Sequence, residues 1–299
     1  MNYLFHVSIY LSIYFIVAMS LNIVVGYCGL LTMAHAGYFA IGSYVYALAT
    51  VKMGLGLIPS LVLGAMIAAT LSLMVSLPSR RLKGDFFIMI TLVVQSLLFT
   101  LLNNWAKPGM EVGTWMNLTN GPFGISGIAK PTIFGSVFDT IGGVAAICAV
   151  IAGMCGIFSW IILGSPWGRL LKSIRDDDLS ARGLGKDPRK ARLQAFAIAC
   201  GMAAIAGGLY ASYVSYIDPS SASLDYSILM LSMVIVGGVG NFRGPLVGAS
   251  LLIVMPEVLR FINIPDAVAA NIRQMAYGLL LVIIVHFRPQ GLAGDYKIE

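Results

Sequence analysis

Long apolar runs alternate with short polar segments along the whole chain. Nine such runs occur, at residues 3–25, 30–51, 55–77, 86–102, 140–163, 193–216, 226–239, 246–261 and 267–287. A helix that crosses a bilayer needs roughly 20 apolar residues in succession, and the first six runs are long enough. The seventh and eighth are short and the ninth contains Arg273, so we expect eight or nine spans. The pattern predicts an all-α membrane protein, a polytopic helical bundle of 8–9 transmembrane helices.

Composition restricts the class of protein further. Of the 299 residues, 58% are hydrophobic and 11% are charged, whereas a soluble chain carries about 25% charged residues. Eight or nine spans would use nearly all of the apolar residues, which leaves no material for a large soluble domain. The sequence therefore excludes a cytosolic enzyme or a nucleic-acid binder with a core of its own. It predicts a single transmembrane domain over residues 1–299.

The basic residues divide unequally between the two sides of the predicted bundle. In a nine-span arrangement, the segments at 80–83 and 164–192, Arg243 and the tail after Phe287 hold 14 Lys and Arg residues, and the opposite side holds 4. Because Lys and Arg favour cytoplasmic loops, the N-terminus is predicted outside and the C-terminus in the cytoplasm. No basic residue precedes the first apolar run, so we expect that helix to be retained rather than removed as a signal peptide.

The sequence lacks the residue patterns of covalent chemistry and of nucleotide binding. A phosphate-binding loop needs GxxxxGK followed by Ser or Thr, and the one Gly-Lys pair, Gly185-Lys186, is followed by Asp187. The three histidines are scattered, and the four cysteines lie in or beside apolar runs without the spacing of a metal site. We therefore expect no catalytic residue, no metal and no cofactor, and a chain that is not an enzyme.

Acidic residues are scarce inside the predicted spans. Glu257 is the one acidic residue well inside an apolar run, and Asp85, Asp139, Asp218 and Asp225 fall at helix ends or in loops. Ion-coupled carriers usually place an ionisable group within the membrane to bind the coupling ion. The scarcity of such residues disfavours a stand-alone secondary carrier, which is kept as an alternative together with a membrane enzyme and a bare scaffold subunit.

Two polar segments are long enough to have a structure of their own. The segment at 164–192, predicted to be cytoplasmic, holds 8 of the 19 basic and 4 of the 13 acidic residues. In it, Asp178 can cap a short helix that Gly183 or Gly185 would end, and Asp187, followed by proline, can begin the next span. This segment is either a solvated connector or a docking helix for a cytoplasmic motor.

The segment at 103–136, predicted to be extracytoplasmic, is rich in glycine and asparagine. Its many glycines indicate either defined turns or plain flexibility. It is either a linker, or a lid or platform for an extracytoplasmic partner.

Uncharged polar residues and glycines lie close to the predicted helix breaks. A spacing of three and then eight residues between glycines occurs twice, at Gly26, Gly29 and Gly37 and at Gly237, Gly240 and Gly248. If these form a repeat, they suggest two related helix pairs around a central path. Broken helices expose backbone groups that lipid cannot satisfy, so nearby polar groups serve either interhelical hydrogen bonds or a polar solute. The candidates for a solute path are Asn22, Thr32, His35, Gly37, Ser43, Gln95 and Asn241.

Several motifs resemble those of a known family, in the same order along nearly the whole chain. They are LNIVVGYCGLLTMAHAG at 21–37, KGDFF at 83–87, NNW at 103–105, SIRD at 173–176, GGVG at 237–240 with GP at 244–245, and FRPQGL at 287–292. On these motifs the chain resembles the LivM-type permeases of branched-chain amino acid ABC importers. Urea and short-amide importers use related permeases, and they give the alternative solute class.

The resemblance implies partners that supply what the sequence lacks. These are a second, LivH-type permease, two cytoplasmic ABC ATPase subunits and a periplasmic solute-binding protein. The resemblance also implies a multi-pass protein in the lipid of the bacterial inner membrane, with no nucleic-acid partner. The implied function is ATP-driven import of leucine, isoleucine and valine.

The segment at 164–192 is similar to the EAA coupling loop of such importers. The resemblance carries the ATPase-coupling role onto Asp178, Ser180, Ala181, Arg182, Leu184 and Gly185. Small residues would let the helix fit into a cleft of the ATPase, and Asp178 and Arg182 would make charge contacts at the rim. The chain departs from the family pattern at Asp178, where Glu is usual, and at Ser180, where Ala is usual.

Overall fold

The computed structural model describes residues 2–76, 85–107, 109–133, 136–260, 266–288 and 290–294. The α-helices are α1 (Asn2–Asn22), α2 (His35–Met53), α3 (Leu57–Ser76), α4 (Asp85–Asn104), α5 (Ile141–Gly164), α6 (Pro166–Asp176), α7 (Asp178–Gly183), α8 (Pro188–Val214), α9 (Leu224–Gly237), α10 (Gly244–Arg260) and α11 (Asp266–Phe287). A π-helix, η1 (Ile23–Tyr27), continues α1, and two short 3₁₀-helices are η3 (Gly121–Phe123) and η4 (Pro219–Ala222). The predicted all-α class is confirmed.

Four short strands form two antiparallel pairs. Strand β1 (Ile125–Ser126) pairs with β4 (Tyr216–Ile217), and β2 (Thr132–Ile133) pairs with β3 (Ser136–Val137). The first pair joins the segment before α5 to the connection that follows α8. These pairs fasten loops at one end of the bundle rather than forming a sheet of their own.

Each of the nine apolar runs falls on a helix, namely on α1 to α5 and α8 to α11. Five of these helices are long and apolar enough to cross a membrane by length and composition: α1 with η1, α3, α4, α5 and α8. Helices α9 and α10 contain shorter apolar stretches. The basic residues predicted at 80–83 lie outside the described residues, and so do the side chains of Glu257 and Arg273.

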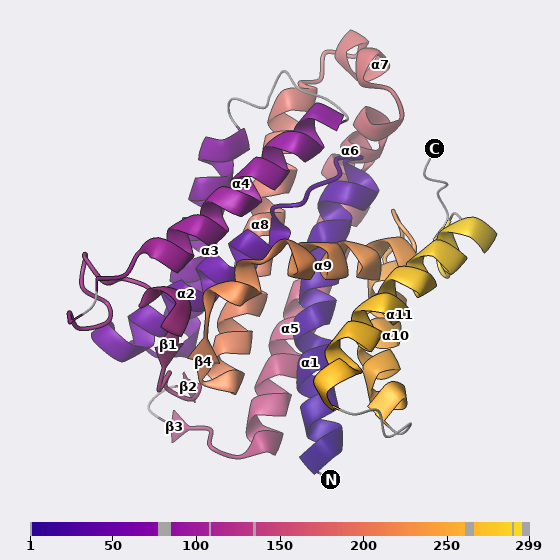
Figure 1. Cartoon of the computed structure of the whole chain (residues 1–299). Coiled ribbons are helices and arrows are strands. Elements are labelled where there is room, and N and C mark those ends of the chain that lie inside the picture. Colours follow the sequence, from indigo (N-terminus) through magenta and orange to yellow (C-terminus); the bar gives the residue numbers. More distant parts are fainter. Residues whose placement is uncertain are drawn as a thin grey trace.

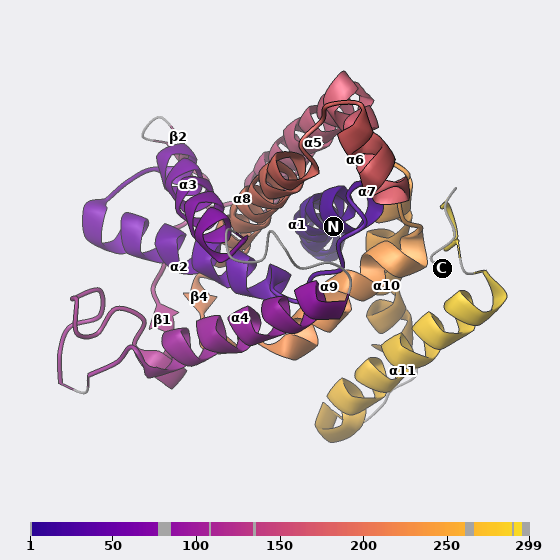
Figure 2. The same cartoon turned by 90° about the horizontal axis from the view of Figure 1, so that it is seen from above.

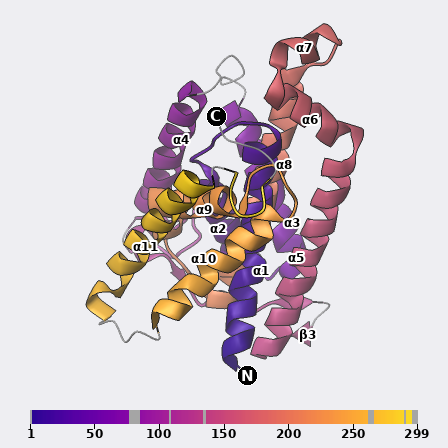
Figure 3. The same cartoon turned by 90° about the vertical axis from the view of Figure 1, so that its right-hand side faces the viewer.

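The helices surround α1, which is buried along most of its length. Helices α1 and α5 run side by side, and α8 packs against both α2 and α3 (Figure 1). Seen from above, α2 to α4 lie on one side of α1, and α10 and α11 lie on the other (Figure 2). Helices α6 and α7 lie at one end of the bundle, here called the α7 end, and the N-terminus lies at the opposite end (Figure 3).

Glycines let α2 and α8 approach each other closely. A Cβ atom added at Gly42 would lie 2.1 Å from the carbonyl oxygen of Ala204, and one at Gly207 would lie 1.9 Å from that of Phe39. Ser43 adds a hydrogen bond across the same contact, because its hydroxyl donates to the carbonyl of Gly207 at 2.8 Å. Small residues and short polar links of this kind are typical of helix pairs within membranes.

The outer faces of α3, α4 and α5 carry large apolar side chains that the rest of the chain leaves exposed. Examples are Met66 on α3, Val93 on α4, and Val150 and Met154 on α5. Exposed apolar surface on several neighbouring helices would be unfavourable in water, whereas lipid covers it at no such cost. The fold is therefore that of a helical membrane protein.

The helix predictions were wrong at two boundaries. Helix α2 begins at His35 rather than at residue 30, because residues 28–34 leave the helical path after η1. The cap of the short helix is Asp177, not Asp178: the Oδ1 atom of Asp177 accepts from the backbone N–H groups of Leu179 (2.8 Å) and Ser180 (3.3 Å). Asp187 caps α8 as predicted, accepting from Arg189 at 3.0 Å.

Candidate functional site

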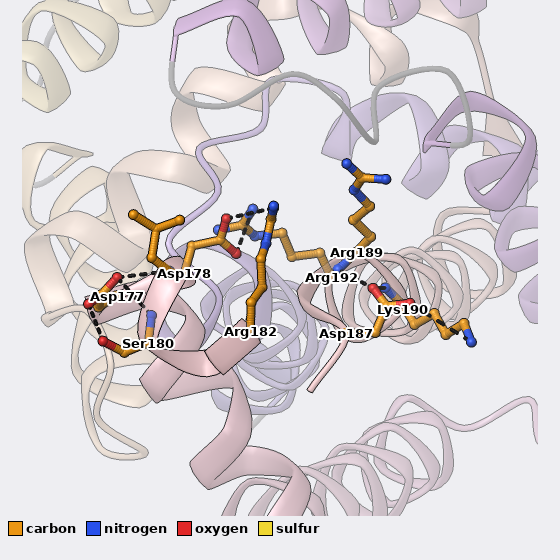
Figure 4. A network of polar contacts seen from close by, with 9 residues as sticks. Asp177, Asp178, Ser180, Arg182, Asp187, Arg189, Lys190 and Arg192 are labelled. Carbon is orange, nitrogen blue, oxygen red and sulfur yellow. Dashed lines mark hydrogen bonds and ion pairs between the residues drawn. The ribbon is translucent and has the colours of Figure 1, made fainter. Parts of the chain in front are cut away.

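Helices α6 and α7 project from the bundle at the α7 end (Figure 3). Ser165 caps α6, its hydroxyl accepting from the backbone N–H of Trp167 at 3.2 Å. Asp177 interrupts the two helices with an extended backbone (φ −152°, ψ 107°), and its carboxylate caps α7 (Figure 4). The N-terminal ends of α6 and α7 therefore both have a side chain that accepts hydrogen bonds from their first backbone N–H groups, which defines the turn between the two helices.

The side chain of Asp178 in α7, which was expected to make charge contacts at the rim of an ATPase cleft, instead points toward the rest of this chain. The Asp178 side chain is 9% exposed, and it pairs with Arg182 at 2.9 Å and with Arg192 of α8 at 3.7 Å (Figure 4). Ala181 is buried as well, at 3% exposure. Asp178 and Ala181 therefore hold α7 against α8 and do not form an outer surface.

The outer surface of α7 is formed by different members of the same motif. Leu179 is 75% exposed and Leu184 is 80% exposed, although both are large apolar side chains. Gly185 has a positive φ of 73° that ends the helical turn. The predicted coupling residues thus divide into two groups. Asp178 and Ala181 face the protein, and Leu184 and Gly185 face outward.

Helix α6 contacts the break that follows α1. The Nη1 atom of Arg175 donates to the carbonyl oxygen of Gly26 at 2.6 Å, and the guanidinium side chain is only 10% exposed. The stem of Arg175 covers Gly29, where an added Cβ would lie 2.6 Å from Arg175 Cγ. One turn earlier, the ammonium of Lys172 lies 4.9 Å from the ring centroid of Tyr27. Two cationic side chains of α6 therefore bind η1 and the residues that follow it.

The break after α1 also meets the break between α9 and α10. A Cβ at Gly26 would lie 2.6 Å from the backbone nitrogen of Gly240, so the two backbones touch. Asn22 joins them: its Oδ1 accepts from the N–H of Gly240 at 3.0 Å, and its Nδ2 donates to the carbonyl of Asn241 at 2.9 Å. Two of the glycines in the repeated spacing, Gly26 and Gly240, thus lie against each other.

The end of the chain completes the second break. The Nδ2 atom of Asn241 donates to the carbonyl of Ala293 at 3.0 Å, and its Oδ1 accepts from the N–H of Arg243 at 3.2 Å. The backbone of Leu292 donates to Val236 at 2.9 Å, and that of Ala293 donates to Gly237 at 2.9 Å. The segment 290–294 therefore supplies the hydrogen bonds that the end of α9 lacks.

Of the other path candidates, Thr32, His35, Gly37 and Gln95 lie around the first turn of α2, and all of them are buried, as is Ser43 further along α2. Gln95 of α4 accepts from the N–H of Gly37 at 2.9 Å and donates to the carbonyl of Ala222 in η4. Thr32 accepts from the N–H of Ala34 at 3.3 Å. These side chains satisfy backbone groups of broken helices, as lipid surroundings require.

His35 combines one short contact with one unpaired atom. Its Nε2 lies 2.7 Å from the hydroxyl of Ser20, near the C-terminal end of α1. Its Nδ1 is buried without a hydrogen-bond partner among the described residues. A buried polar atom without a partner is uncommon in proteins, and it distinguishes His35 from the other path candidates.

A group of tyrosines that the sequence patterns did not single out lies between three helices. Tyr10, Tyr14, Tyr210, Tyr213 and Tyr226 come from α1, α8 and α9 and are half-buried. Tyr10 lies 5.8 Å from Tyr213 and 6.4 Å from Tyr210 between ring centroids. The spacing of Tyr10 and Tyr14 by four residues, and of Tyr210 and Tyr213 by three, could have revealed a shared aromatic face.

Residues typical of metal centres do not gather in the part of the chain that the structure describes: no three His, Cys, Asp or Glu side chains come together there. The features that do gather are two helix breaks, a surface helix pair bound to one of them, and polar side chains between helices. A helical membrane protein with this arrangement belongs to the transport class rather than to the soluble enzymes.

Comparison with known proteins identifies the family. The chain matches the family described as "Branched-chain amino acid transport system / permease component" over residues 3–285, and it belongs to that family. No solved structure matches the chain.

Relatives of the chain are permeases from bacteria and an archaeon. The high-affinity branched-chain amino acid transport system permease protein LivM of Escherichia coli K12 is 31% identical, over 94% of this chain and 67% of its own length. The probable branched-chain amino acid transport permease protein LivM of Methanocaldococcus jannaschii is 27% identical, over 98% of this chain and 93% of its own length. The autoinducer 2 import system permease protein LsrC of Salmonella paratyphi B is 26% identical over 48% of this chain and 41% of its own length.

The contact between the two breaks predicts a cost for removing Asn22. In the Asn22→Ala variant, the N–H of Gly240 and the carbonyl of Asn241 lose their partners while buried. An unsatisfied buried group costs about 1–3 kcal/mol, so we expect the purified variant to unfold several degrees below the parent protein in a thermal melt in detergent.

The matched control is Asn104→Ala, which removes an asparagine whose Nδ2 donates within its own helix to Thr100 at an exposed position. We expect this control to melt like the parent protein. If both variants melt at the same temperature, Asn22 does not join the breaks in the stable protein.

Proposed function

We propose that this chain is a permease subunit of an ATP-driven importer for leucine, isoleucine and valine. In this proposal it forms the translocation path together with a second permease of the LivH type. Two cytoplasmic ABC ATPase subunits supply the energy, and a periplasmic solute-binding protein delivers the solute. The observation that carries the proposal is the 31% identity to LivM of Escherichia coli K12 over 94% of this chain.

The proposal places the chain as one transmembrane domain of residues 1–299 in the bacterial inner membrane, with eight or nine spans. The N-terminus is outside, and the α7 end is cytoplasmic. Support comes from the basic residues of 164–192, which favour the cytoplasmic side, and from the position of α6 and α7 at the end opposite the N-terminus (Figure 1). The segments at 103–133 and 136–139 then lie on the extracytoplasmic side, where the binding protein docks.

The surface of α7 is proposed to fit the ATPase. Leu179 and Leu184 present apolar side chains to the solvent, which is unfavourable unless a partner covers them. Ser180, Arg182 and Gly185 complete this surface. Asp178 and Ala181 have a different role, because they fix α7 on α8 so that a push on α7 moves the helices behind it.

The solute is proposed to pass between the breaks. The path candidates Asn22, Thr32, Gly37, Ser43, Gln95 and Asn241 are bound to other parts of the chain in this conformation, and His35 has one free nitrogen. Opening of the path therefore requires the breaks to separate, which exposes backbone groups to water and solute. The half-buried tyrosines of α1, α8 and α9 lie on the extracytoplasmic half of this path.

Uptake by the assembled importer tests the solute class. The chain is co-expressed with its partner subunits, purified and reconstituted in liposomes with ATP inside and binding protein outside. We expect uptake of labelled leucine that unlabelled valine and isoleucine reduce and urea does not. Competition by urea or a short amide, without competition by valine, would show the alternative solute class instead. Uptake by this chain alone under an ion gradient would show a secondary carrier.

Exposed apolar residues on α7 predict the effect of one substitution. In Leu184→Asp, a charge replaces an apolar contact with the ATPase, and we expect the amount of co-purified ATPase to fall at least about tenfold, a loss of about 1.4 kcal/mol. The control is Met116→Asp, an exposed apolar position at the opposite end of the protein. Full retention of the ATPase by the Leu184 variant would remove α7 from the docking surface.

The contact of Arg175 with the first break predicts an uncoupled variant. Arg175→Ala removes the hydrogen bond to Gly26 and uncovers Gly29, while the exposed face of α7 stays the same. We expect the assembled variant to hydrolyse ATP but to import leucine at least about tenfold more slowly. This follows because a hydrogen bond of a charged group contributes about 1.5–3 kcal/mol.

Two further variants separate this role from a loss of stability. Arg175→Lys keeps the charge and should restore part of the uptake, and Arg169→Ala changes an exposed arginine on the same helix and should behave as the parent protein. If uptake and ATP hydrolysis fall in parallel in Arg175→Ala, the side chain supports assembly and does not transmit movement.

A further inference from the structure

A groove of about 880 Å³ lies between α3, α5 and α8, on a side face of the bundle. Its walls are apolar side chains such as Leu61 and Met66 of α3 and Ile147 and Met154 of α5. Gly201 and Ile205 of α8 lie in its floor. A groove without hydrogen-bonding groups cannot bind a polar solute well, but it fits a hydrocarbon chain.

The groove continues toward the α7 end. A second hollow of about 520 Å³ shares Ala197 and Ile198 with the first, and it extends to Leu73, Trp167 and Gln194. The indole Nε1 of Trp167 donates to Gln194 Oε1 at 3.1 Å. Tryptophan with its polar edge bonded and its apolar body facing inward is typical of the boundary between lipid tails and headgroups.

Basic side chains follow at the same end of α8. Arg189 and Lys190 precede Leu193 and Gln194 by four residues, so they share a face of the helix with the residues that line the hollow. The side chain of Lys190 is 81% exposed, and its carboxylate neighbour Asp187 is 3.8 Å away (Figure 4). The ammonium of Lys190 is therefore only weakly paired, and it lies at the end of the groove where the headgroup of a bound lipid would be.

The length of the groove fits an acyl chain. From Lys190 to Ile205, α8 rises roughly 22 Å, which exceeds the ~15 Å of hydrocarbon in one leaflet. Most of the lining side chains are large, such as Met154 and Phe158, although small residues such as Ala65, Ala69 and Gly201 also line the groove. Contacts between helices in membranes are enriched in small residues. The length of the groove, the predominance of large side chains and the basic residues at one end therefore favour lipid over a helix of another subunit.

We propose that this groove binds a phospholipid with an anionic headgroup, its acyl chain lying between α3, α5 and α8 and its phosphate bound by Arg189 and Lys190. The site is separate from the helix breaks, and it requires only that the chain lie in a membrane. Such basic sites beside a transmembrane helix are a recurrent way of selecting anionic lipids.

Lipid retention tests the proposal. The full chain is purified, equilibrated with vesicles of equal parts phosphatidylglycerol and phosphatidylcholine in detergent, washed, and analysed by native mass spectrometry. We expect phosphatidylglycerol to remain bound in preference to phosphatidylcholine. In the double variant Arg189→Gln, Lys190→Gln, we expect the ratio of bound phosphatidylglycerol to bound phosphatidylcholine to fall about tenfold. The control Lys52→Gln, Lys107→Gln, with the same charge change at residues that do not border the groove, should keep it.

A second variant tests the hydrocarbon part of the site. Ala197→Phe fills the junction of the two hollows, and we expect it to retain less lipid of either headgroup while its thermal melt stays that of the parent protein. Equal retention of the two lipids by the parent protein would overturn the proposal. So would photo-crosslinks from groove residues to another protein subunit in the assembled importer, with none to a diazirine-labelled phosphatidylglycerol.

Discussion

Backbone hydrogen bonding at the two helix breaks is the constraint on which the rest of this structure depends. Lipid offers no partner to an N–H or carbonyl group, so an interrupted helix inside a membrane must find its partners in the protein. Here Asn22 provides them for Gly240 and Asn241, Gln95 for Gly37, and the segment 290–294 for the end of α9. Removing the side chain of Asn22 or of Gln95 leaves two backbone groups unpaired, because each of these side chains bonds two of them.

The same constraint explains why a surface helix is connected to the interior of the bundle. The carbonyl of Gly26 in η1 finds its partner in Arg175, which belongs to the α6–α7 pair at the end of the bundle. A charged side chain that satisfies a backbone group also fixes the distance between the two elements. A continuous chain of contacts therefore runs from α6 through Gly26 and Asn22 to the break between α9 and α10.

Sequence patterns were sufficient for the nine apolar helices and for the short helix α7, but they did not predict α6 or the contacts between helices. Nine apolar runs predicted the helices from α1 to α5 and from α8 to α11, and the longer runs match the length that a bilayer requires of a spanning helix. Three consecutive aspartates from Asp176 to Asp178 could each cap a helix, and only the backbone angles at Asp177 decide between them. The burial of Ala181 also depends on how α7 packs against α8, and no local pattern records that.

The repeated glycine spacing was informative in a limited way. The spacing predicted two helix breaks. It did not predict that Gly26 contacts Gly240, because spacing along a chain does not determine which backbones touch. The tyrosines of α1, α8 and α9 were missed for the same reason. Each pair has helical spacing, but the pairs come together only when α1 lies beside α8. In a membrane bundle, length and polarity determine the helices, whereas small residues and buried hydrogen bonds determine which helices meet.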